Sequence, residues 1–409
     1  MSKLEELIQK LCPNGVEYKK IGDVANVTIG EFVHKNLQRN DAQYPVYNGG
    51  ITNTGFYEEY NQTKNKVIIS ARGANAGFVN RVFTNFWSGN SCYTINVFDK
   101  CVDWNFLYYW LKSREKKLLG EQQKGSIPAV SKKQVENFLV PIPPIEVQEE
   151  IVRILDTFTE LTAELTAELT AELTARKKQY EFYRDKLLSF DDLNRGGGYE
   201  KSLTSQVKWV RLGDLALVTK LAGFEFTKYV KYSNSGQIIA LRGLNVKNGQ
   251  LDLTDVKYID ESDLSKLERS KLRKGDLLFT YVGTVGQVAL INEDEKFYLA
   301  PNVALIRITN ERVMPDYLRY YCQSNNFYKK EILRLIQASS MQNIPMEKIR
   351  KFVVPIPPLE EQERIVAILD RFDKLCNDIS EGLPAEIEAR QKQYEYYRDR
   401  ILQFRILNS

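Results

Sequence analysis

The chain has 409 residues, and its 57 basic and 53 acidic side chains leave a formal net charge of +4. At roughly 150 residues per domain this length predicts two to three domains, and 43% hydrophobic residues are typical of a folded globular chain. No stretch approaches about 18 consecutive apolar residues, and the N-terminus MSKLEELIQK has no apolar signal segment. We therefore expect a cytoplasmic protein without a membrane span.

Residue types that enzymes use most are scarce or dispersed. The single histidine, His34, is expected to be an ordinary loop or strand residue, because one ring cannot build a multi-histidine metal site. The five cysteines are scattered without a CxxC pair, so neither a disulfide framework nor a zinc site is expected, only reduced and mostly packed thiols. Phosphate-binding GxGxxG and GxxxxGK[ST] loops and a GxSxG elbow are absent. Catalysis by this chain alone is not expected.

Residues 1–144 predict the first domain. Short apolar runs such as KVIIS at 66–70 are separated by Gly- and Asn-rich clusters at 48–55 and 73–77. This pattern is typical of short strands joined by tight turns, and it predicts a strand-rich α+β domain.

A long helix is predicted next, within residues 145–195. Pro143 and Pro144 suit a helix entry, and the acidic residues that follow favour the positive end of the helix dipole. Steps of four and three residues, typical of a coiled-coil seam, separate Val147, Ile151, Ile154, Phe158, Leu161 and Leu165. We expect this seam to pack against the second copy of the helix.

The tetrapeptide TAEL occurs three times in tandem from Thr162 to Leu173. Each unit adds ~6 Å of helical rise and ~40° of net rotation to a leucine stripe. We expect a helical spacer whose length changes in fixed steps, set by Leu161, Leu165, Leu169 and Leu173.

Residues 196–353 predict a second strand-rich domain, and residues 354–409 a second helical tract. VPIPPIEVQEEIVRILDTF at 140–158 recurs at 354–372 with 14 of 19 positions identical, and ARKKQYEFYRDKLLSF at 175–190 recurs at 389–404 with 11 of 16 identical. Both repeats have an offset of 214 residues. Gly382 and Pro384 are expected to break the second helix, and Ile365, Ile368, Phe372 and Leu375 to form its seam.

Charge follows the same boundaries. Basic residues outnumber acidic ones by 18 to 13 in residues 1–144 and by 24 to 17 in residues 200–353, whereas both helical tracts are acidic. Basic lobes rich in polar loop residues suit a polyanion such as nucleic acid.

The two copies of VPIPPxExQExIVxILD and ARxKQYExYRD, with the tandem TAEL units, resemble the specificity subunit of type I restriction-modification enzymes. The resemblance implies two target-recognition domains separated by two long antiparallel coiled-coil helices, an α+β fold with a pseudo-two-fold internal repeat. It further implies a non-catalytic subunit that binds a bipartite, asymmetric double-stranded DNA target. The implied partners are two modification subunits, which hold S-adenosylmethionine and methylate adenine, and two restriction subunits, which use ATP and Mg.

YPVYNGGITNTGFYEEY at 44 and VIISARGANAGFVN at 67 resemble a recurrent pattern of such recognition domains. Polar loop residues are therefore our candidates for DNA contact, with Arg preferred because it binds guanine bidentately. The candidates in the first lobe are Arg72, Asn75, Asn90 and Lys124, and those in the second are Arg242, Thr284, Asn302, Ser339, Gln342 and Asn343.

Two other classes of function agree less well with the sequence. A single-chain DNA methyltransferase is disfavoured, because the chain lacks an NPP[FY] motif and a cofactor loop. A coiled-coil scaffold that binds only proteins leaves the basic lobes unexplained.

Overall fold

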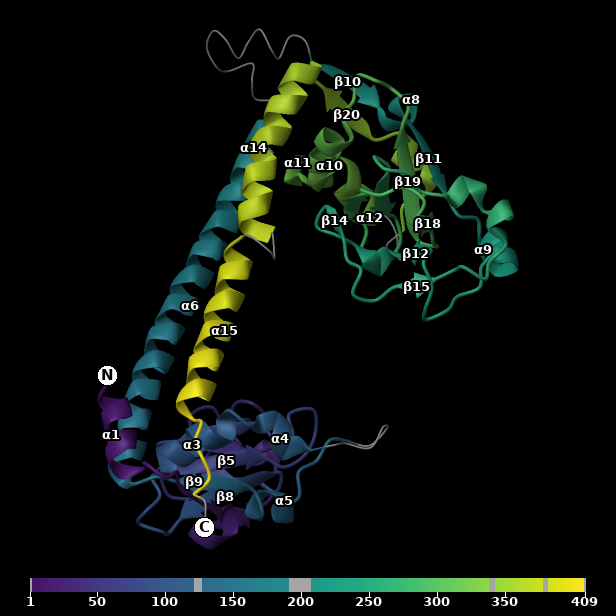
Figure 1. The fold of residues 1–409 in the computed structure, drawn as a ribbon. Coiled ribbons are helices and arrows are strands. Elements are labelled where there is room, and N and C mark those ends of the chain that lie inside the picture. The colour runs from purple at the N-terminus through teal and green to yellow at the C-terminus, as the bar shows by residue number, and fades with distance from the viewer. Residues whose placement is uncertain (1, 121–126, 191–206, 338–342, 378–381, 408–409) are drawn as a thin grey trace. The chain divides into compact units, whose positions relative to one another are not determined.

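The computed structural model describes residues 2–120, 127–190, 207–337, 343–377 and 382–407 (Figure 1). The chain divides into two compact units. Unit 1 comprises Met1–Leu169 and Glu386–Ser409, and unit 2 comprises Thr170–Ala385. Each unit consists of one strand-rich lobe with parts of the helical tracts. The expected boundary at residues 195 and 196 lies outside the described residues.

Lobe 1, the strand-rich part of unit 1, is built on two sheets. Four antiparallel strands are ordered β2-β8-β5-β6, and a three-stranded sheet is ordered β4-β3-β7, with β3 and β7 parallel. A separate antiparallel pair, β1 with β9, closes the lobe next to the long helix. The elements are α1 (Lys3–Leu11), β1 (Glu17–Lys20), α2 (Ile21–Val24), β2 (Ala25–Ile29), η1 (Lys35–Leu37), β3 (Tyr44–Tyr47), β4 (Gly55–Tyr57), β5 (Lys66–Ser70), β6 (Val79–Val82), β7 (Trp87–Ser88), β8 (Cys92–Val97), α3 (Trp104–Lys112), α4 (Glu115–Leu119), α5 (Lys132–Glu136) and β9 (Leu139–Ile142).

Lobe 2, the strand-rich part of unit 2, repeats this topology. Its sheets are ordered β11-β19-β16-β17 and β15-β12-β18, with β12 and β18 parallel, and β10 pairs with β20. The elements are β10 (Lys208–Arg211), α8 (Leu212–Leu215), β11 (Ala216–Lys220), α9 (Gly223–Tyr229), β12 (Ile239–Leu241), η3 (Gly243–Asn245), β13 (Val246–Lys247), β14 (Gln250–Leu251), β15 (Lys257–Tyr258), η4 (Leu264–Lys266), η5 (Glu268–Ser270), β16 (Leu277–Thr280), β17 (Val288–Leu290), β18 (Phe297–Leu299), β19 (Val303–Ile308), α10 (Pro315–Gln323), α11 (Asn325–Phe327), η6 (Tyr328–Ile332), α12 (Leu333–Gln337), α13 (Met346–Arg350) and β20 (Val353–Ile356).

The duplication that the helical motifs indicated therefore extends through both lobes. Each strand of lobe 1 has a counterpart in lobe 2 in the same chain order, and lobe 2 adds α9 and the β13-β14 hairpin. The predicted α+β fold with an internal repeat is confirmed. The expected two-fold axis concerns the placement of one unit relative to the other and stays a prediction.

Three long helices follow from the repeated motifs. They are α6 (Ile145–Leu187), α14 (Leu359–Asn377) and α15 (Leu383–Ile401). The TAEL units lie within α6, which is helical throughout. In the second tract α14 ends the described stretch at Asn377 and α15 begins at Leu383, directly after the non-helical Gly382, as Gly382 and Pro384 predicted, because proline is accommodated only in the first turn of a helix. Residues 378–381 lie outside the described residues.

Within each unit the paired helices run antiparallel. In unit 1 the ring of Phe158 on α6 lies 6.4 Å from that of Tyr397 on α15, and the hydroxyls of Thr159 and Tyr394 are 3.0 Å apart. In unit 2 the rings of Tyr180 and Tyr183 on α6 lie 6.4 and 5.8 Å from that of Phe372 on α14.

The inner part of the predicted seam lies in the lobes. Val147 and Ile151 are fully buried in the core of lobe 1, together with Leu155. Ile365 and Leu369 are buried in the same way in lobe 2. The periodicity correctly predicted a buried face on each helix, but it does not determine whether a lobe or a helix covers that face.

The outer part of the leucine stripe is also less buried than a seam requires. Leu161 is 56% exposed, Leu165 and Leu173 are half-buried, and Leu169 is buried. In the second copy Leu375 is 38% exposed. The stepwise length-setting role of the four leucines stays a prediction.

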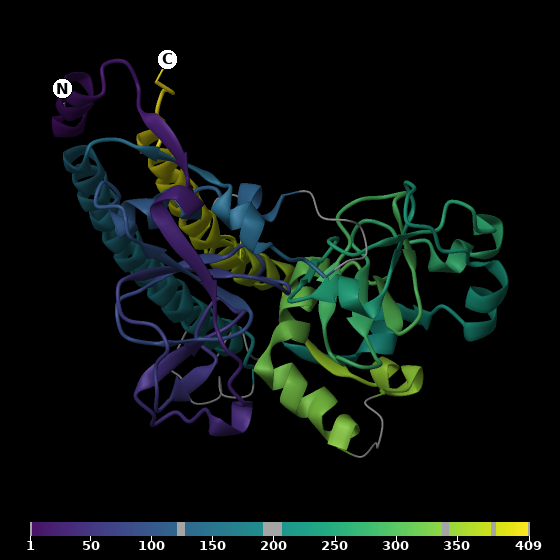
Figure 2. The ribbon, with the colours of Figure 1, turned by 90° about the horizontal axis from the view of Figure 1, so that it is seen from below.

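The last turns of the helical tracts are anchored in the lobes. Leu188, just after α6, is buried in the core of lobe 2, and Leu402, just after α15, is buried in the core of lobe 1. In Figure 2 the C-terminal segment lies beside the N-terminal strand, where the backbone N–H of Val16 donates to the Arg405 carbonyl at 2.9 Å. Gly15 has a φ of +101°, and a Cβ there would lie 2.6 Å from the Arg405 oxygen, so this position requires glycine.

Candidate nucleic-acid interface

One edge of lobe 1 gathers four loop segments, which we call loop edge 1. Its centre is the loop 71–78 between β5 and β6, where Ala71 N–H donates to the Ser91 carbonyl and Val130 N–H donates to the Ala71 carbonyl, both at 2.8 Å. The segment after β3 joins them, because a Cβ on Gly49 would lie 2.6 Å from the Arg72 oxygen. Loop edge 1 therefore comprises residues 48–50, 71–78, 89–91 and 127–130.

Lobe 2 has an equivalent loop edge 2. The N–H of Tyr281, on the loop 281–287 between β16 and β17, donates to the Asn302 carbonyl at 3.3 Å, and Ile344 N–H donates to the Tyr281 carbonyl at 2.9 Å. Residues 242–243 follow β12 as residues 48–50 follow β3, and the adjacent Leu241 carbonyl accepts from Ala300 N–H at 3.1 Å. Loop edge 2 therefore comprises residues 242–243, 281–287, 301–302 and 343–344.

Glycines shape both loops in the same way. Gly73 and Gly77 in lobe 1 have φ of +95° and +84°, and Gly283 and Gly286 in lobe 2 have φ of +78° and +92°. All four occupy the left-handed region that other residues rarely adopt. The loops of the two lobes therefore share left-handed glycines at equivalent ends, whereas their side chains differ and the loop of lobe 2 is one residue shorter.

The structure brings most of the sequence candidates to these edges. In lobe 1, Arg72 and Asn90 are exposed and Asn75 is half-buried. In lobe 2, Thr284, Asn302 and Asn343 are exposed, and Asn343 forms a bridge with Val282. Lys124, Ser339 and Gln342 lie outside the described residues.

Two arginines at equivalent edges have different surroundings. Arg72 is exposed and has no ion pair with a residue that the structure describes. Arg242 donates through Nη2 to the carbonyl and the carboxylate of Asp255 at 2.8 and 3.0 Å, and its side chain is 21% exposed. Arg72 is thus open to a ligand, whereas Arg242 already has an intramolecular partner.

Sequence reasoning missed Asn48, which stands in lobe 1 where Arg242 stands in lobe 2. A Cβ on Gly89 would lie 1.7 Å from the Asn48 Oδ1, so the side chain lies across the turn that leads to Asn90. The signal was the YNGG stretch, which predicted a turn and resembled part of a recognition-domain pattern, but its asparagine was not among the predicted contact residues. We add Asn48 to the candidate residues.

The repeated motifs occupy a different part of each unit, where lobe meets helix. Gln148 is fully buried: its Oε1 accepts from Asp103 N–H at 2.9 Å, and its Nε2 donates to the carbonyls of Cys101 and Pro143 at 2.7 Å. Gln362 repeats this with Met314 N–H at 2.9 Å and the carbonyls of Arg312 and Pro357 at 2.7 and 2.9 Å. The glutamine of the PPxExQ motif therefore joins the helix to its lobe.

A groove lies between α6 and α15 in unit 1. Two of its side chains are exposed although large and apolar, with Leu161 at 56% and Tyr397 at 42%. The groove is lined by Phe158, Leu161, Thr162, Leu165, Arg390, Gln393, Tyr394 and Tyr397.

The cysteines are packed as expected for four of five. Cys12, Cys92, Cys322 and Cys376 are buried, Cys101 is exposed, and all are free thiols. Burial raises the pKa of Cys92 to about 12, so this thiol is protonated and unreactive at neutral pH. None of the helices in the described ranges is both long and apolar enough to span a bilayer.

Comparison with known proteins agrees with this duplicated architecture. The family model described as type I restriction modification DNA specificity domain matches residues 13–175 and again residues 204–389, once for each repeat. The chain therefore belongs to this family of DNA-specificity proteins.

Individual relatives support the assignment along the whole chain. A Haemophilus influenzae protein named "Putative type I restriction enzyme specificity subunit" is 32% identical over 98% of each chain. The specificity subunit of an Escherichia coli type I restriction enzyme is 32% identical over 73% of this chain and 70% of its own.

A solved chain from a study of complex assembly and conformational transition of the type I R-M system shares the fold. It covers 96% of this chain and 98% of its own with a TM-score of 0.64 and 17% identity. The predicted family is confirmed, as is the expectation of a specificity subunit rather than an enzyme, because the named relatives are specificity subunits.

Proposed function

We propose that loop edges 1 and 2 each bind one half of a bipartite, asymmetric double-stranded DNA target. The observation that supports this most directly is that the two loop edges follow equivalent strands but carry different side chains. Arg72 in lobe 1 is replaced by Val282 at the corresponding place of lobe 2, and Ala74, Asn75 and Ala76 between the loop glycines are replaced by only Thr284 and Val285. Equivalent edges with different donors and acceptors would select different base sequences.

Charge supports DNA as the ligand. Both lobes carry an excess of basic residues, which can neutralise phosphates and release counterions. The positive-φ glycines leave the backbone of each loop unobstructed by side chains, and Arg72 lies beside them without an ion pair to a described residue. Binding should therefore weaken steeply with salt, while selectivity depends on the loop residues.

The remaining partners follow from the family. We infer that two modification subunits and two restriction subunits assemble on this chain, and that S-adenosylmethionine, ATP and Mg are bound by them. The groove between α6 and α15 suits such docking, because Leu161 and Tyr397 expose apolar surface there.

A gel shift combined with cofactor crosslinking separates this function from the two alternatives. The full chain should shift DNA in a salt-dependent manner and take up no crosslinked S-adenosylmethionine without its modification subunits. Cofactor crosslinking to the lone chain would favour a single-chain methyltransferase. Failure of the assembled complex to bind DNA would favour a protein-binding scaffold.

Methylome sequencing then tests the bipartite target. A host that expresses the chain with its modification subunits should methylate adenines in two defined segments separated by a spacer of fixed length. A continuous motif or a palindromic pair of identical half-sites would contradict the proposal.

A further inference from the structure

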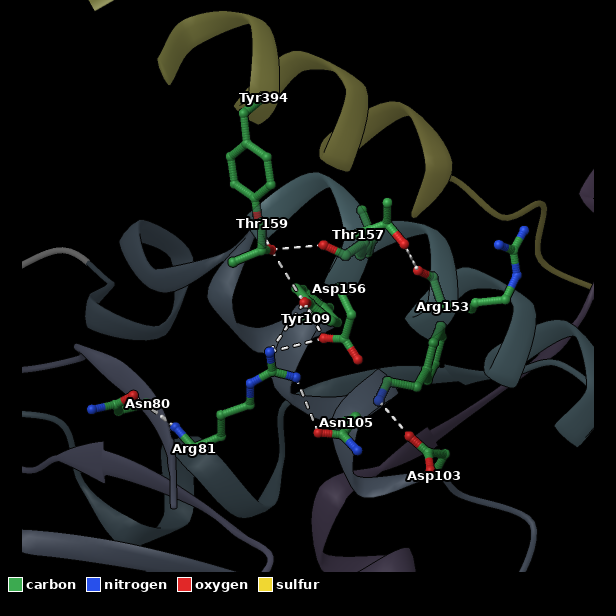
Figure 3. Close-up of polar contacts among 12 residues, drawn as sticks. Asn80, Arg81, Asp103, Asn105, Tyr109, Arg153, Asp156, Thr157, Thr159 and Tyr394 are labelled. Carbon is green, nitrogen blue, oxygen red and sulfur yellow. Dashed lines mark hydrogen bonds and ion pairs between the residues drawn. The ribbon is translucent and has the colours of Figure 1, made fainter. Parts of the chain in front are cut away.

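A hydrogen-bonded network joins lobe 1 to both helices of unit 1 (Figure 3). The Tyr109 hydroxyl on α3 donates to the Asp156 carboxylate on α6 at 2.6 Å and lies 3.2 Å from the Thr159 hydroxyl. Thr159 in turn lies 3.0 Å from the Tyr394 hydroxyl on α15. Arg81 on β6 forms an ion pair with Asp156 at 2.8 Å. We call these five residues the Tyr109 network.

The network is held in place by its surroundings. Tyr109 is 1% exposed, and burial together with the bond to Asp156 raises its pKa well above the ordinary value, so it remains a donor. The Arg81 guanidinium lies 4.8 and 5.0 Å from the ring centres of Tyr108 and Tyr109, and it donates to Asn105 at 3.1 Å. Such stacked and bonded side chains have little rotational freedom.

Unit 2 contains the counterpart. The Tyr320 hydroxyl on α10 donates to Asp370 on α14 at 2.6 Å, and the Arg319 guanidinium lies 3.5 Å from the same carboxylate and 3.9 Å from the Tyr320 ring. Asp370 is 214 residues after Asp156, and Tyr394 is 214 residues after Tyr180, which is buried against α14 in unit 2. The repeated ILD motif thus supplies the Asp in both units. The Tyr of the QYE motif comes from the other tract in each unit, but the Tyr180 hydroxyl, unlike that of Tyr394, has no hydrogen-bond partner among the described residues.

The position of Arg81 connects this network to the DNA-binding edge. β6 begins at Val79, directly after the loop 71–78 that contains Arg72 and Asn75. A rotation of α3 and β6 on α6 would therefore turn loop edge 1 with them. The loop must face a groove squarely to contact base edges, and one base pair of B-DNA corresponds to ~34° of twist.

We propose that Arg81, Tyr109 and Asp156, with Thr159 and Tyr394, are positioning residues that fix the angle of loop edge 1 on the helices and thereby restrict the spacer between half-sites. This inference rests on the proposed bipartite DNA recognition. The network does not contact DNA: it makes a spacer one base pair too short or too long unfavourable, because the lobe cannot rotate to follow the displaced half-site.

The test uses Tyr109→Phe and Tyr394→Phe, each of which removes one hydroxyl and leaves the ring. The exposed Tyr396→Phe is the matched control, since Tyr396 is 61% exposed and lies outside the network. Each full-length variant, assembled with its modification subunits, is titrated with DNAs that keep both half-sites and differ in spacer by zero, one or two base pairs. Thermal unfolding verifies that the variants are folded.

We expect Tyr109→Phe to reduce discrimination against a one-base-pair change roughly fivefold to tenfold, and Tyr394→Phe to reduce it by a smaller factor. Affinity for the preferred spacer should fall by less than about threefold, and Tyr396→Phe should match the unaltered chain. A purely structural role would weaken binding to DNAs of all spacer lengths equally and leave the ratio of their affinities unchanged. That result would overturn the inference but not the proposed function. If the unaltered complex binds no bipartite DNA, both fall.

Discussion

The parts of this chain that are repeated almost unchanged and the parts that differ between the two copies lie in different places. The tracts 140–158 and 354–372 share 14 of 19 residues, and their shared residues Gln148 and Gln362, or Asp156 and Asp370, make matching contacts at the lobe–helix junctions. Loop edges 1 and 2 share left-handed glycines at equivalent ends but few side chains. The repeat is therefore preserved at the lobe–helix junctions and divergent at the edges that we propose bind DNA.

The largest expected effect concerns the buried glutamines. Gln148→Ala removes the partner of one buried and two partly buried backbone groups, and at ~1 to 3 kcal/mol for a buried unsatisfied group and less for the others it should destabilise unit 1 by about 3 kcal/mol. Gln362→Ala should do the same to unit 2. Hydrogen exchange measured by mass spectrometry should locate each loss in its own unit, while the exposed Gln391→Ala changes neither. Equal loss of protection in both units would break the comparison.

Base readout should be confined to one half-site for each edge. Arg72→Ala should weaken binding by ~1 to 3 kcal/mol for targets with the correct first half-site and leave preference at the other half unchanged. Thr284→Ala, at the corresponding edge of lobe 2, is the reciprocal variant. Competition binding with DNAs altered in one half at a time measures both. A preference that changes in both halves after either substitution would refute separate readers.

Spacer length should respond to the first helix, which alone contains the TAEL units. One unit more or less rotates the following helix by ~40°, close to the ~34° of one base pair, whereas its ~6 Å rise exceeds one step of ~3.4 Å. We expect the rotation, rather than the rise, to determine the length of the DNA spacer. The junction between Asn377 and Leu383 should absorb the excess rise along the helix axis. Chains with two or four units should methylate motifs whose spacer differs by one base pair, with both half-sites retained. An unchanged spacer would leave the repeat as inert filler.

The smallest expected effect concerns Glu150, a residue that differs between the lobe–helix junctions of the two units. Glu150, 4% exposed, accepts from Arg153 at 2.6 Å and Lys3 at 2.8 Å, and these bonds hold its pKa at about 2 rather than 4.5. Because this pKa is depressed, its contribution is fully present above pH 4.5 and is lost as pH falls towards 2. In the second copy of the repeat this position is occupied by Arg364, so unit 2 has no carboxylate there.

Glu150→Gln should therefore lower the unfolding free energy of unit 1 by about 1 kcal/mol at pH 7, since both cationic partners are exposed. The difference from the unaltered chain should shrink as pH falls below 4.5. Urea titration at several pH values measures it, with the neighbouring exposed Glu149→Gln as control. A difference that stays constant down to pH 3 would contradict the assignment.

The sequence predicted the helical tracts well because their signals are local. Prolines before Ile145 and Leu359 and the interruption near Gly382 act on the adjacent turns, and the 214-residue repeat needs no structure to be seen. The pairing of β1 with β9 joins residues 17–20 to residues 139–142, and such distant, short strands have no local signature. The topology of the lobes could therefore not be derived beyond their α+β class.

The candidate site shows the same limit. Arg72 was predicted because it precedes a loop glycine and arginine can bind guanine bidentately; it is exposed, and its contact with DNA stays a prediction. Asn48 was missed because only the meeting of β3 with the turn at Gly89 reveals its place. What covers the inner part of the seam could not be predicted, because Val147 shows a helical period whether it faces a helix or a lobe.

The burial of Leu402 in lobe 1 also has a consequence for the order in which the chain can fold during synthesis. Unit 2 is one continuous stretch, Thr170–Ala385, and all of its residues are synthesised before Leu402. Unit 1 begins to emerge first but is completed after unit 2, because the site for Leu402 and the backbone pairing of Val16 with Arg405 stay empty until residues 402–405 have been synthesised. Lobe 1 therefore stays incompletely packed while unit 2 is made, so truncations that remove Leu402 and Arg405 should destabilise the N-terminal lobe more than lobe 2, which lies closer to them in sequence.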